Sequence, residues 1–171
     1  MHSVTTNAGL AKPDAYREMN GQLSGLLAGE RNALANAANT AALLYQSLPD
    51  LNWAGFYFLQ NGELVLGPFQ GKVACVRIAL GQGVCGSAAA RRETLVVADV
   101  HEFPGHIACD ADSNSEIVVP LLEDGLLWGV LDLDSPTVNR FDREDAAGLE
   151  ALVAMFLSAS DLEAFFKPAR P

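Results

Sequence analysis

Apolar residues recur at three- and four-residue steps across residues 14–47, the spacing that gives a helix one apolar face. Gly25, Gly29 and Asn36 interrupt this pattern, so it predicts either one long helix or two shorter ones. Pro49 ends the pattern, because proline cannot continue a helix. The first part of the chain is therefore expected to be helical.

Short runs rich in valine, leucine and aromatic residues follow in the middle of the chain, and this composition is typical of β-strands. Two of the breaks between runs contain Asn61-Gly62 and Asp124-Gly125, and such pairs are the strongest short-range signal for a β-hairpin. An alanine-rich stretch at residues 84–92 predicts a brief helix instead. Strands are expected at residues 53–59, 63–69, 72–80, 95–98, 117–122 and 126–133.

A final amphipathic helix is predicted after Asp142, whose carboxylate is placed to cap it. Helices thus lie at both ends of the chain, and no repeat, linker or low-complexity block separates the elements. This order predicts an α+β fold: a single domain with a mainly antiparallel central sheet and the N- and C-terminal helices packed on one face. It is similar to the order found in GAF and PAS domains, which are small sensory and ligand-binding modules. We expect residues 1–13 to be a flexible lead, residues 14–165 the domain, and residues 166–171 a tail.

The chain of 171 residues has the length of one ordinary domain. Its 11 basic and 21 acidic residues give a net charge of −10, which repels phosphate backbones and anionic lipids, so nucleic acid and membrane partners are not expected. The amino terminus lacks the pattern of a secretory signal, and no apolar stretch is long enough to span a bilayer. We therefore expect a cytoplasmic protein whose three cysteines start as reduced thiols.

Residues 81–86 read Gly-Gln-Gly-Val-Cys-Gly, which fits the pattern of a dinucleotide-binding loop, and Asp99 ends the next predicted strand as a ribose-binding acid would. The following helix is short, however, and the later strands form a hairpin rather than the crossovers of a doubly wound sheet. We therefore interpret the glycines as a turn that brings the backbone close to a ligand.

Residues 99–115 form a long polar segment, and a loop of this length in a compact domain is usually functional. It contains His101, His106 and Cys109, which are all metal-ligand types. The chain has no Cys-x-x-Cys pair, and the His-x-Glu at His101 lacks the downstream cysteines of a zinc deaminase. We therefore expect no metal site and interpret the histidines as hydrogen-bonding loop residues.

The three cysteines, Cys75, Cys85 and Cys109, are candidates for redox chemistry. Cys85 lies at a predicted helix start, where the helix dipole favours a thiolate, and Cys109 lies in the polar loop, where solvent access is expected. A thiol that reacts with an oxidised substrate becomes a sulfenic acid, which a second thiol within reach converts to a recyclable disulfide. The alternative is that all three are small buried side chains.

Three carboxylates are candidates for substrate binding and acid catalysis. Asp132 and Asp134 lie two residues apart in an apolar run, so on a strand they share one face. Glu116 opens the preceding strand of the same predicted hairpin, which allows the three groups to converge. Clustered carboxylates bind an ammonium group, and their repulsion raises one pKa so that this group can donate a proton at neutral pH. A solvated sheet face is the alternative.

Aromatic residues of the first strand are candidates for an apolar subsite. Strand alternation places Trp53, Gly55 and Tyr57 on one face, and the small glycine would leave a slot between the two rings. Packing in the core is the other use of these side chains.

Six runs, in order along the chain, together contain all three cysteines: LNWAGFY (51–57), GPFQGKVACVRI (67–78), GVCG (83–86), FPGHIACD (103–110), SNSEIVVP (113–120) and GVLDLDSP (129–136). These runs closely resemble the GAF-domain free methionine-(R)-sulfoxide reductases. The resemblance implies an enzyme that reduces the R epimer of free methionine sulfoxide and has no bound metal or organic cofactor. It also implies recycling by thioredoxin, with thioredoxin reductase and NADPH, and a homodimer.

By position, the resemblance assigns a role to each cysteine. Cys109 would be the nucleophile that attacks the sulfoxide sulfur, leaving a sulfenic acid and free methionine. Cys75 would be the principal resolving thiol. Cys85 would be an auxiliary thiol that can exchange into the disulfide.

The resemblance also implies roles for the pocket residues. Glu116 and Asp134 would bind and protonate the sulfoxide, and Asp132 would help to hold the substrate ammonium. Trp53 and Tyr57 would enclose the methyl group.

The acidic neighbours of Cys109 raise a question about its activation. Asp110, Asp112 and Glu116 are close to it in sequence and should raise its thiol pKa, which is opposite to the usual activation of a nucleophilic cysteine. We infer that activation resides mainly in the substrate, because a protonated sulfoxide is a better electrophile.

Two other functions stay open at this point. One is a GAF sensory module that binds a small molecule without turning it over. The other is a thiol-based redox sensor, which would use the cysteines but leave the carboxylate cluster unexplained.

Overall fold

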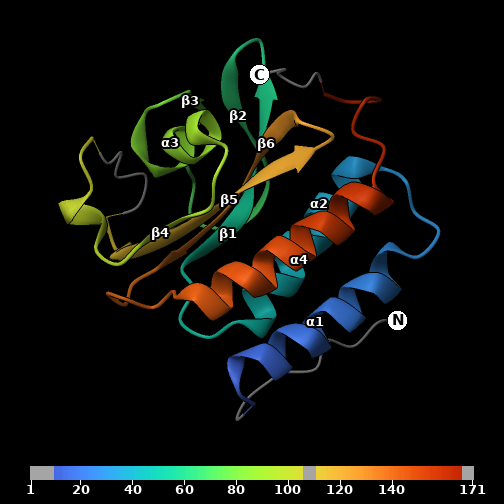
Figure 1. The fold of residues 1–171 in the computed structure, drawn as a ribbon, viewed down its shortest axis with the longest axis horizontal. Coiled ribbons are helices and arrows are strands. Elements are labelled where there is room, and N and C mark those ends of the chain that lie inside the picture. The colour runs from blue at the N-terminus through green and yellow to red at the C-terminus, as the bar shows by residue number, and fades with distance from the viewer. Residues whose placement is uncertain (1–9, 106–110, 167–171) are drawn as a thin grey trace.

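The computed structural model describes residues 10–105 and 111–166, which form a six-stranded antiparallel sheet in the order β3-β2-β1-β6-β5-β4 (Figure 1). The predicted α+β fold class is confirmed. The helices are α1 (Lys12–Leu27), α2 (Ala33–Ser47), α3 (Gly83–Arg91) and α4 (Arg143–Ala159), with a 3-10 turn η1 (Val100–Glu102). The strands are β1 (Trp53–Gln60), β2 (Glu63–Gly71), β3 (Arg77–Ala79), β4 (Leu95–Val97), β5 (Ser115–Glu123) and β6 (Leu126–Ser135).

The apolar periodicity of the first part of the chain corresponds to two helices, so the second of the two sequence alternatives is confirmed. Gly29 has a positive φ of 79°, which takes the chain out of helical geometry after α1. Asn32 then caps α2, because its side chain accepts hydrogen bonds from the N–H groups of Leu34 and Ala35, both at 3.0 Å. The domain limits expected at residues 14 and 165 stay predictions.

Both predicted hairpin turns are confirmed. Asn61 and Gly62 have φ values of 53° and 85°, and Asp124 and Gly125 have φ values of 50° and 74°. A positive φ at both central residues is typical of a type I′ turn, whose twist matches that of the strands it joins. The turns therefore set the register of the β1–β2 and β5–β6 pairs.

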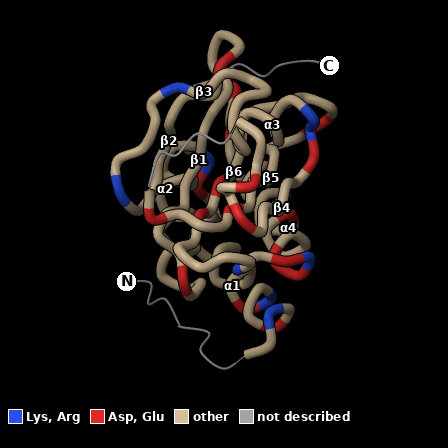
Figure 2. The backbone as a smooth tube through the Cα atoms, turned by 90° about the vertical axis from the view of Figure 1, so that its left-hand side faces the viewer, with Lys and Arg blue, Asp and Glu red and all other residues tan. Residues whose placement is uncertain are grey.

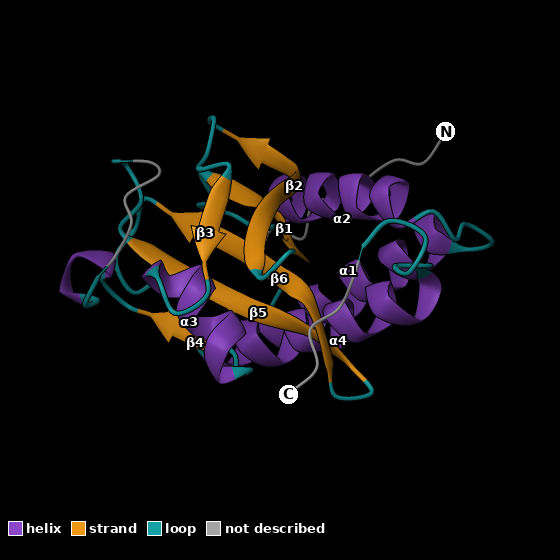
Figure 3. Cartoon of the chain, turned by 90° about the horizontal axis from the view of Figure 1, so that it is seen from above, coloured by secondary structure: helices purple, strands orange, loops and turns teal. Residues whose placement is uncertain are grey.

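The two faces of the sheet carry separate hydrophobic cores. On one face, α2 and α4 pack against alternate strand residues such as Phe56 and Ile117, and α1 packs on these two helices. Figure 3 shows the three helices gathered together. On the other face, α3 packs against Tyr57, Val118 and Val130. The predicted packing of the terminal helices on one face is thus confirmed, and α3 lies on the opposite side of the sheet (Figure 1).

A buried carboxylate joins the first and last helices. The Asp145 side chain, in the first turn of α4, accepts hydrogen bonds from the Tyr16 hydroxyl and from the N–H of Asp142, both at 2.9 Å. It also forms ion pairs with Lys12 and Arg140. Asp142 caps α4 as predicted and completes a reciprocal capping box with Asp145. Every oxygen of this buried charge therefore has a partner.

The strand predicted at residues 72–80 is wrong over most of its length, because β3 contains only Arg77–Ala79. Two backbone carbonyls of the preceding segment bond to side chains instead of to a neighbouring strand. The Lys72 carbonyl accepts from the Trp53 indole N–H, and the Cys75 carbonyl accepts from the Tyr57 hydroxyl, both at 3.1 Å. The alternating pattern of the segment does not reveal these partners.

Acidic and basic positions both occur at many separate points along the backbone, as Figure 2 shows. Within residues 10–105 and 111–166, every helix is too short or too polar to cross a bilayer.

Candidate functional site

Strand register brings the three predicted carboxyl groups together at one end of the sheet. Asp134 of β6 lies between Trp53 of β1 and Glu116 of β5, and it pairs with both. Asp132 lies two residues earlier on β6, so its side chain is on the same face. That face is the one covered by α3. The predicted convergence of the carboxylates is confirmed.

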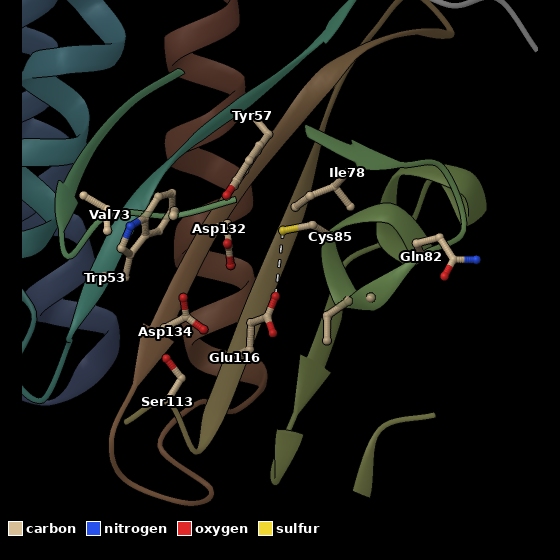
Figure 4. A pocket seen from close by; sticks show the side chains of 13 residues that line it. Trp53, Tyr57, Val73, Ile78, Gln82, Cys85, Ser113, Glu116, Asp132 and Asp134 are labelled. Atoms are coloured by element: carbon tan, nitrogen blue, oxygen red, sulfur yellow. Dashed lines mark hydrogen bonds between the residues drawn. The ribbon is translucent and has the colours of Figure 1, made fainter. Parts of the chain in front are cut away.

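These carboxyl groups line a pocket between the sheet and α3 (Figure 4). The start of α3 forms one wall, and the segment that precedes β3 forms another. Figure 4 shows the side chains of Glu116, Asp132 and Asp134 pointing into the space that Cys85 faces from α3. The lining residues are Trp53, Tyr57, Val73, Ala74, Ile78, Gln82, Gly83, Val84, Cys85, Ser113, Glu116, Asp132 and Asp134.

The pocket holds protons at groups that are usually ionised. Burial raises the pKa of Asp132 to about 7. Burial, together with the negative charges of Asp132 and Asp134, raises the pKa of Glu116 well above its usual range. Of the described residues that line the pocket, none is lysine, arginine or histidine. Protons therefore neutralise these carboxyl groups, and an acid is available at neutral pH.

Cys85 lies near the start of a helix as predicted, but the structure does not make it a thiolate. Its side chain is buried, and its thiol donates to Glu116 Oε1 across 3.8 Å. Burial, and then the charges of Asp132 and Glu116, raise the pKa of Cys85 well above its usual range. Desolvation and acidic neighbours outweigh the helix dipole, so the expectation of a thiolate was wrong. Cys85 is a free, protonated thiol.

Cys75 is disulfide-bonded and half-buried, in contrast to Cys85. It lies in the segment whose carbonyls bond to Trp53 and Tyr57, so these two aromatic residues position it. Cys109, the predicted nucleophile, lies outside the described residues, as does its neighbour Asp110.

The two predicted aromatic residues line the pocket, but the slot expected between them is filled. The rings of Trp53 and Tyr57 lie 5.8 Å apart and nearly parallel. Phe69 also stacks on the indole, with ring centroids 5.3 Å apart. A side chain on Gly55 would meet the Phe69 Cβ at 2.4 Å and the indole at 2.7 Å. The absence of a side chain at Gly55 therefore makes room for the Trp53 and Phe69 rings.

The glycine pattern at residues 81–86 begins as a turn, as interpreted from the sequence, and from Gly83 onward it forms the start of α3. An added Cβ at Gly86, in α3, would lie 2.3 Å from the Ala79 carbonyl oxygen, so the close approach of the helix to the end of β3 needs a residue without a side chain there. The sheet is antiparallel, which excludes a doubly wound dinucleotide fold. Asp99 caps η1 by accepting from the His101 N–H at 2.9 Å.

Two sets of residues bear on metal binding. His101 Nε2 lies 3.1 Å from Asn114 Oδ1, which fits its interpretation as a hydrogen-bonding loop residue, while His106 lies outside the described residues. Sequence reasoning missed a different set. Ligand atoms of Cys85, Glu116 and Asp132 lie within 4.8 Å of one another, close enough to share an ion. The expected absence of a metal site stays a prediction.

Sequence reasoning also gave no role to Ser113 or to the backbone at the start of α3. Ser113 is buried in the pocket wall, and its hydroxyl accepts from the Asn52 side chain at 2.9 Å. Gln82 and Gly83 bring backbone to the pocket. The glycine pattern was a signal for the second feature, but the sequence around Ser113 offered none beyond the family resemblance.

The chain is similar to known proteins over most of its length. The GAF domain model matches residues 30–159. A free methionine-R-sulfoxide reductase of Escherichia coli is 54% identical over 158 residues, which cover 91% of this chain and 96% of that protein. One from Saccharomyces cerevisiae is 44% identical over 160 residues, 89% of each chain.

A solved structure agrees with these relatives. The X-ray structure of the free methionine-R-sulfoxide reductase from Neisseria meningitidis, in complex with its substrate, is 45% identical to this chain. The TM-score is 0.89, and the match covers 96% of this chain and 97% of that one. The chain therefore belongs to the GAF-domain family of free methionine-R-sulfoxide reductases.

Proposed function

We propose that the protein reduces free L-methionine-(R)-sulfoxide to L-methionine with its own cysteine thiols. The observation that carries the proposal is the pocket in which protonated carboxyl groups face a disulfide-bearing segment and a buried thiol. Relatives named for this activity, from a bacterium and a yeast, support it over most of the chain. The neisserial relative in complex with its substrate supports it as well.

The charges of the pocket suit a free amino acid. Asp132 is placed to help bind the α-ammonium group, since a carboxylate is the natural partner of a cation. The start of α3 lines the same space, and the N–H groups of a first helical turn bind a carboxylate. A methionine sulfoxide within a peptide has neither free group, so it would lose both interactions.

Glu116 is the proposed acid, acting together with Asp134. Its raised pKa keeps it protonated at neutral pH, so it can donate to the sulfoxide oxygen. The arriving ammonium group lowers the pKa of nearby carboxyl groups, and Asp132 responds by ionising, because its pKa of about 7 is close to ambient pH. Substrate binding thereby leaves Glu116 as the proton donor and Asp132 as the carboxylate that binds the ammonium group. Protonation makes the sulfoxide sulfur a better electrophile, which compensates for a nucleophile in acidic surroundings.

Two thiols complete the chemistry. Cys109 attacks the sulfoxide sulfur, the oxygen passes to the cysteine sulfur as a sulfenic acid, and methionine leaves. The Cys75 thiol then attacks the sulfenic sulfur, a disulfide forms, and the oxygen leaves as water. The disulfide at Cys75 and the free state of Cys85 support Cys75 as the resolving residue. Cys109 has its role from the family resemblance alone.

The two electrons of each turnover come from an external dithiol, for which we propose thioredoxin with thioredoxin reductase and NADPH. The reaction needs no bound metal or organic cofactor on this proposal, so treatment with a strong chelator followed by desalting should leave turnover unchanged. A loss that added metal restores would favour an ion at Cys85, Glu116 and Asp132 instead. The homodimer and the cytoplasmic location stay predictions.

The first experiment is methionine release from the separate R and S epimers of free methionine sulfoxide, with the same epimers within a peptide as controls. Turnover should be confined to the free R epimer. If the folded, reduced protein turns over none of the four, the proposal is wrong and a ligand-binding GAF domain is the better interpretation. Oxidation by peroxide without any turnover would favour a redox sensor.

Cysteine variants test the order of the steps under single-turnover conditions. Cys109→Ser should release no methionine, because it lacks the nucleophile. Cys75→Ser should release about one methionine per site and then stop at the sulfenic acid. Cys85→Ser is the matched control and should keep this burst. Equal loss of the burst in the Cys75 and Cys109 variants would contradict the assignment.

A further inference from the structure

We propose that residues 72–76 form the surface on which a protein dithiol docks to reduce the disulfide at Cys75. This inference rests on the proposed function, because a reductase that ends each turnover as a disulfide must be recycled by a dithiol. It goes further by naming the surface of the chain that the reductant contacts and the sulfur that it attacks.

The segment presents apolar side chains to solvent on both sides of the disulfide. Val73 is 88% exposed and Val76 is 64% exposed, the two highest values among the exposed large hydrophobic residues of the described chain. Ala74 and Cys75, between them, turn inward and pack against the core beneath α3. A disulfide that is half-buried and flanked by exposed apolar side chains offers a partner both a target and a contact surface.

The exposure is built into the fold, because the segment is held at both ends. Trp53 and Tyr57 fix its carbonyls from below, as described above. At its end, the Val76 carbonyl accepts from the N–H of Leu66 at 3.0 Å. The valines are therefore presented by an ordered backbone, and an ordered surface loses little conformational entropy when a partner binds.

The charges beside the segment are paired. Lys72 forms an ion pair with Asp112, and Arg77 forms one with Glu63. The protein carries a net charge of −10, and acidic positions occur at many separate points along the backbone (Figure 2). A locally balanced, apolar surface adds no unpaired charge that would oppose the approach of a protein partner.

The chemistry on this surface is thiol–disulfide exchange. A thiolate of the partner attacks Cys75 Sγ, the disulfide breaks, and the displaced sulfur of this chain takes a proton. The second thiol of the partner then attacks the partner's sulfur in the mixed disulfide and releases Cys75 as a thiol. The partner loses two electrons and becomes a disulfide, and this chain gains them and is ready for another turnover.

Val76→Asp is the test, with thioredoxin as the protein dithiol and dithiothreitol as the small one. Val76 does not line the pocket, whereas Val73 does, so only Val76 separates docking from substrate binding. We expect kcat/KM for thioredoxin to fall about tenfold, because an apolar contact is replaced by a buried charge, while turnover with dithiothreitol stays unchanged. Val96→Asp is the matched control. It is a 41% exposed valine on β4, at the opposite edge of the sheet, and should change neither rate.

Other outcomes overturn the proposal. Equal loss with both reductants means that the site itself is disturbed, and no loss with thioredoxin means that the segment is not the docking surface. A shift of the variant to a smaller assembly in sedimentation, with an unchanged thioredoxin rate, would assign the segment to a second copy of the chain. Failure of thioredoxin to support turnover that dithiothreitol supports would also overturn it. If the wild-type protein releases no methionine with dithiothreitol, the proposed function itself has failed.

A mixed-disulfide trap supplies a second measurement. Thioredoxin without its resolving cysteine should be captured on the wild-type protein, and mass spectrometry should locate the bond at Cys75. Val76→Ser, a milder change at the same exposed position, should slow this capture about threefold. Capture at Cys85 or Cys109 would show that a different sulfur is attacked.

Discussion

Buried carboxyl groups occur on both faces of the sheet, but they are neutralised in different ways. Between α1 and α4, Asp145 is fully buried and its oxygens meet Lys12, Arg140 and the Tyr16 hydroxyl. On the face covered by α3, Glu116 and Asp132 are buried among apolar residues, another carboxylate and a thiol. Cations neutralise the first site, and protons neutralise the second.

The difference separates a structural role from a chemical one. A carboxylate held by cations and hydrogen bonds has little reason to change its protonation state, and it orients the elements around it. A carboxyl group held by burial and like charge changes its protonation state when a cation arrives. Variants of the two sites should therefore affect different properties, and the following predictions go from the largest expected effect to the smallest.

Glu116→Gln should lower the single-turnover rate of methionine release by about 10²- to 10⁴-fold, because it removes the acid and keeps the volume. The free energy of unfolding should stay the same or rise, since an amide is less costly to bury than a carboxylate among carboxylates. Rapid-quench assays and urea unfolding measure the two properties. A variant that loses stability in proportion to activity would contradict the division between the two faces.

Asp145→Asn should show the reverse. It leaves Lys12 and Arg140 without the charge that holds them, and breaking a buried ion pair in this way costs about 3 kcal/mol of unfolding free energy. Once the folded fraction is accounted for, the rate per folded molecule should be unchanged. Arg17→Gln is a suitable control, because its pair with Asp14 is exposed on both sides and contributes at most about 0.5 kcal/mol. A large loss of activity in folded Asp145→Asn would mean that Asp145 also affects the chemistry of the pocket, which contradicts the division.

The two sites should also respond to pH in opposite directions. The pKa of Asp132 is raised to about 7 in the folded state. Between the usual pKa of an aspartate and about pH 7, the folded state therefore keeps a proton that the unfolded state has released. Stability from this group is therefore lost as pH rises from about 4 to about 7. The hydrogen bond from Lys12 lowers the pKa of Asp142, so the stability that this group contributes is lost as pH falls.

Asp132→Asn isolates the first contribution. We expect urea unfolding of the wild-type protein to show a decline of about 2 kcal/mol between pH 5 and 7, and the variant to show a smaller one. The slope that stays in the variant belongs to Glu116, whose raised pKa has the same sign. Identical slopes in the two proteins would mean that Asp132 carries no proton in the folded state.

Local sequence signals predicted much of the fold. The hairpins at Asn61-Gly62 and Asp124-Gly125, the cap at Asp142 and the fold class were found, because each depends on residues that are close in sequence. The strand expected at residues 72–80 failed for the opposite reason. The carbonyls of Lys72 and Cys75 bond to the side chains of Trp53 and Tyr57, which only the folded sheet brings into reach.

The sequence predicted which residues form the site but not their protonation states. Strand alternation placed Asp132 and Asp134 on one face, and the predicted hairpin allowed Glu116 to converge with them, as the register confirms. The sequence also placed Cys85 at a helix start, but it carried no information about the depth of burial or the carboxyl groups opposite, and these reverse the expected pKa shift. Burial is a property of the whole fold, so a local sequence pattern does not predict the ionisation of a buried group.

The two tight turns lie at the end of the sheet away from the pocket, because β1 and β5 each start beside the pocket and run away from it. Exposed turns of this kind are where new chain ends and inserted domains are best tolerated. Asn61-Gly62 and Asp124-Gly125 are therefore suitable positions for a reporter domain, with which a sensor for oxidised methionine can be engineered while the pocket keeps its geometry.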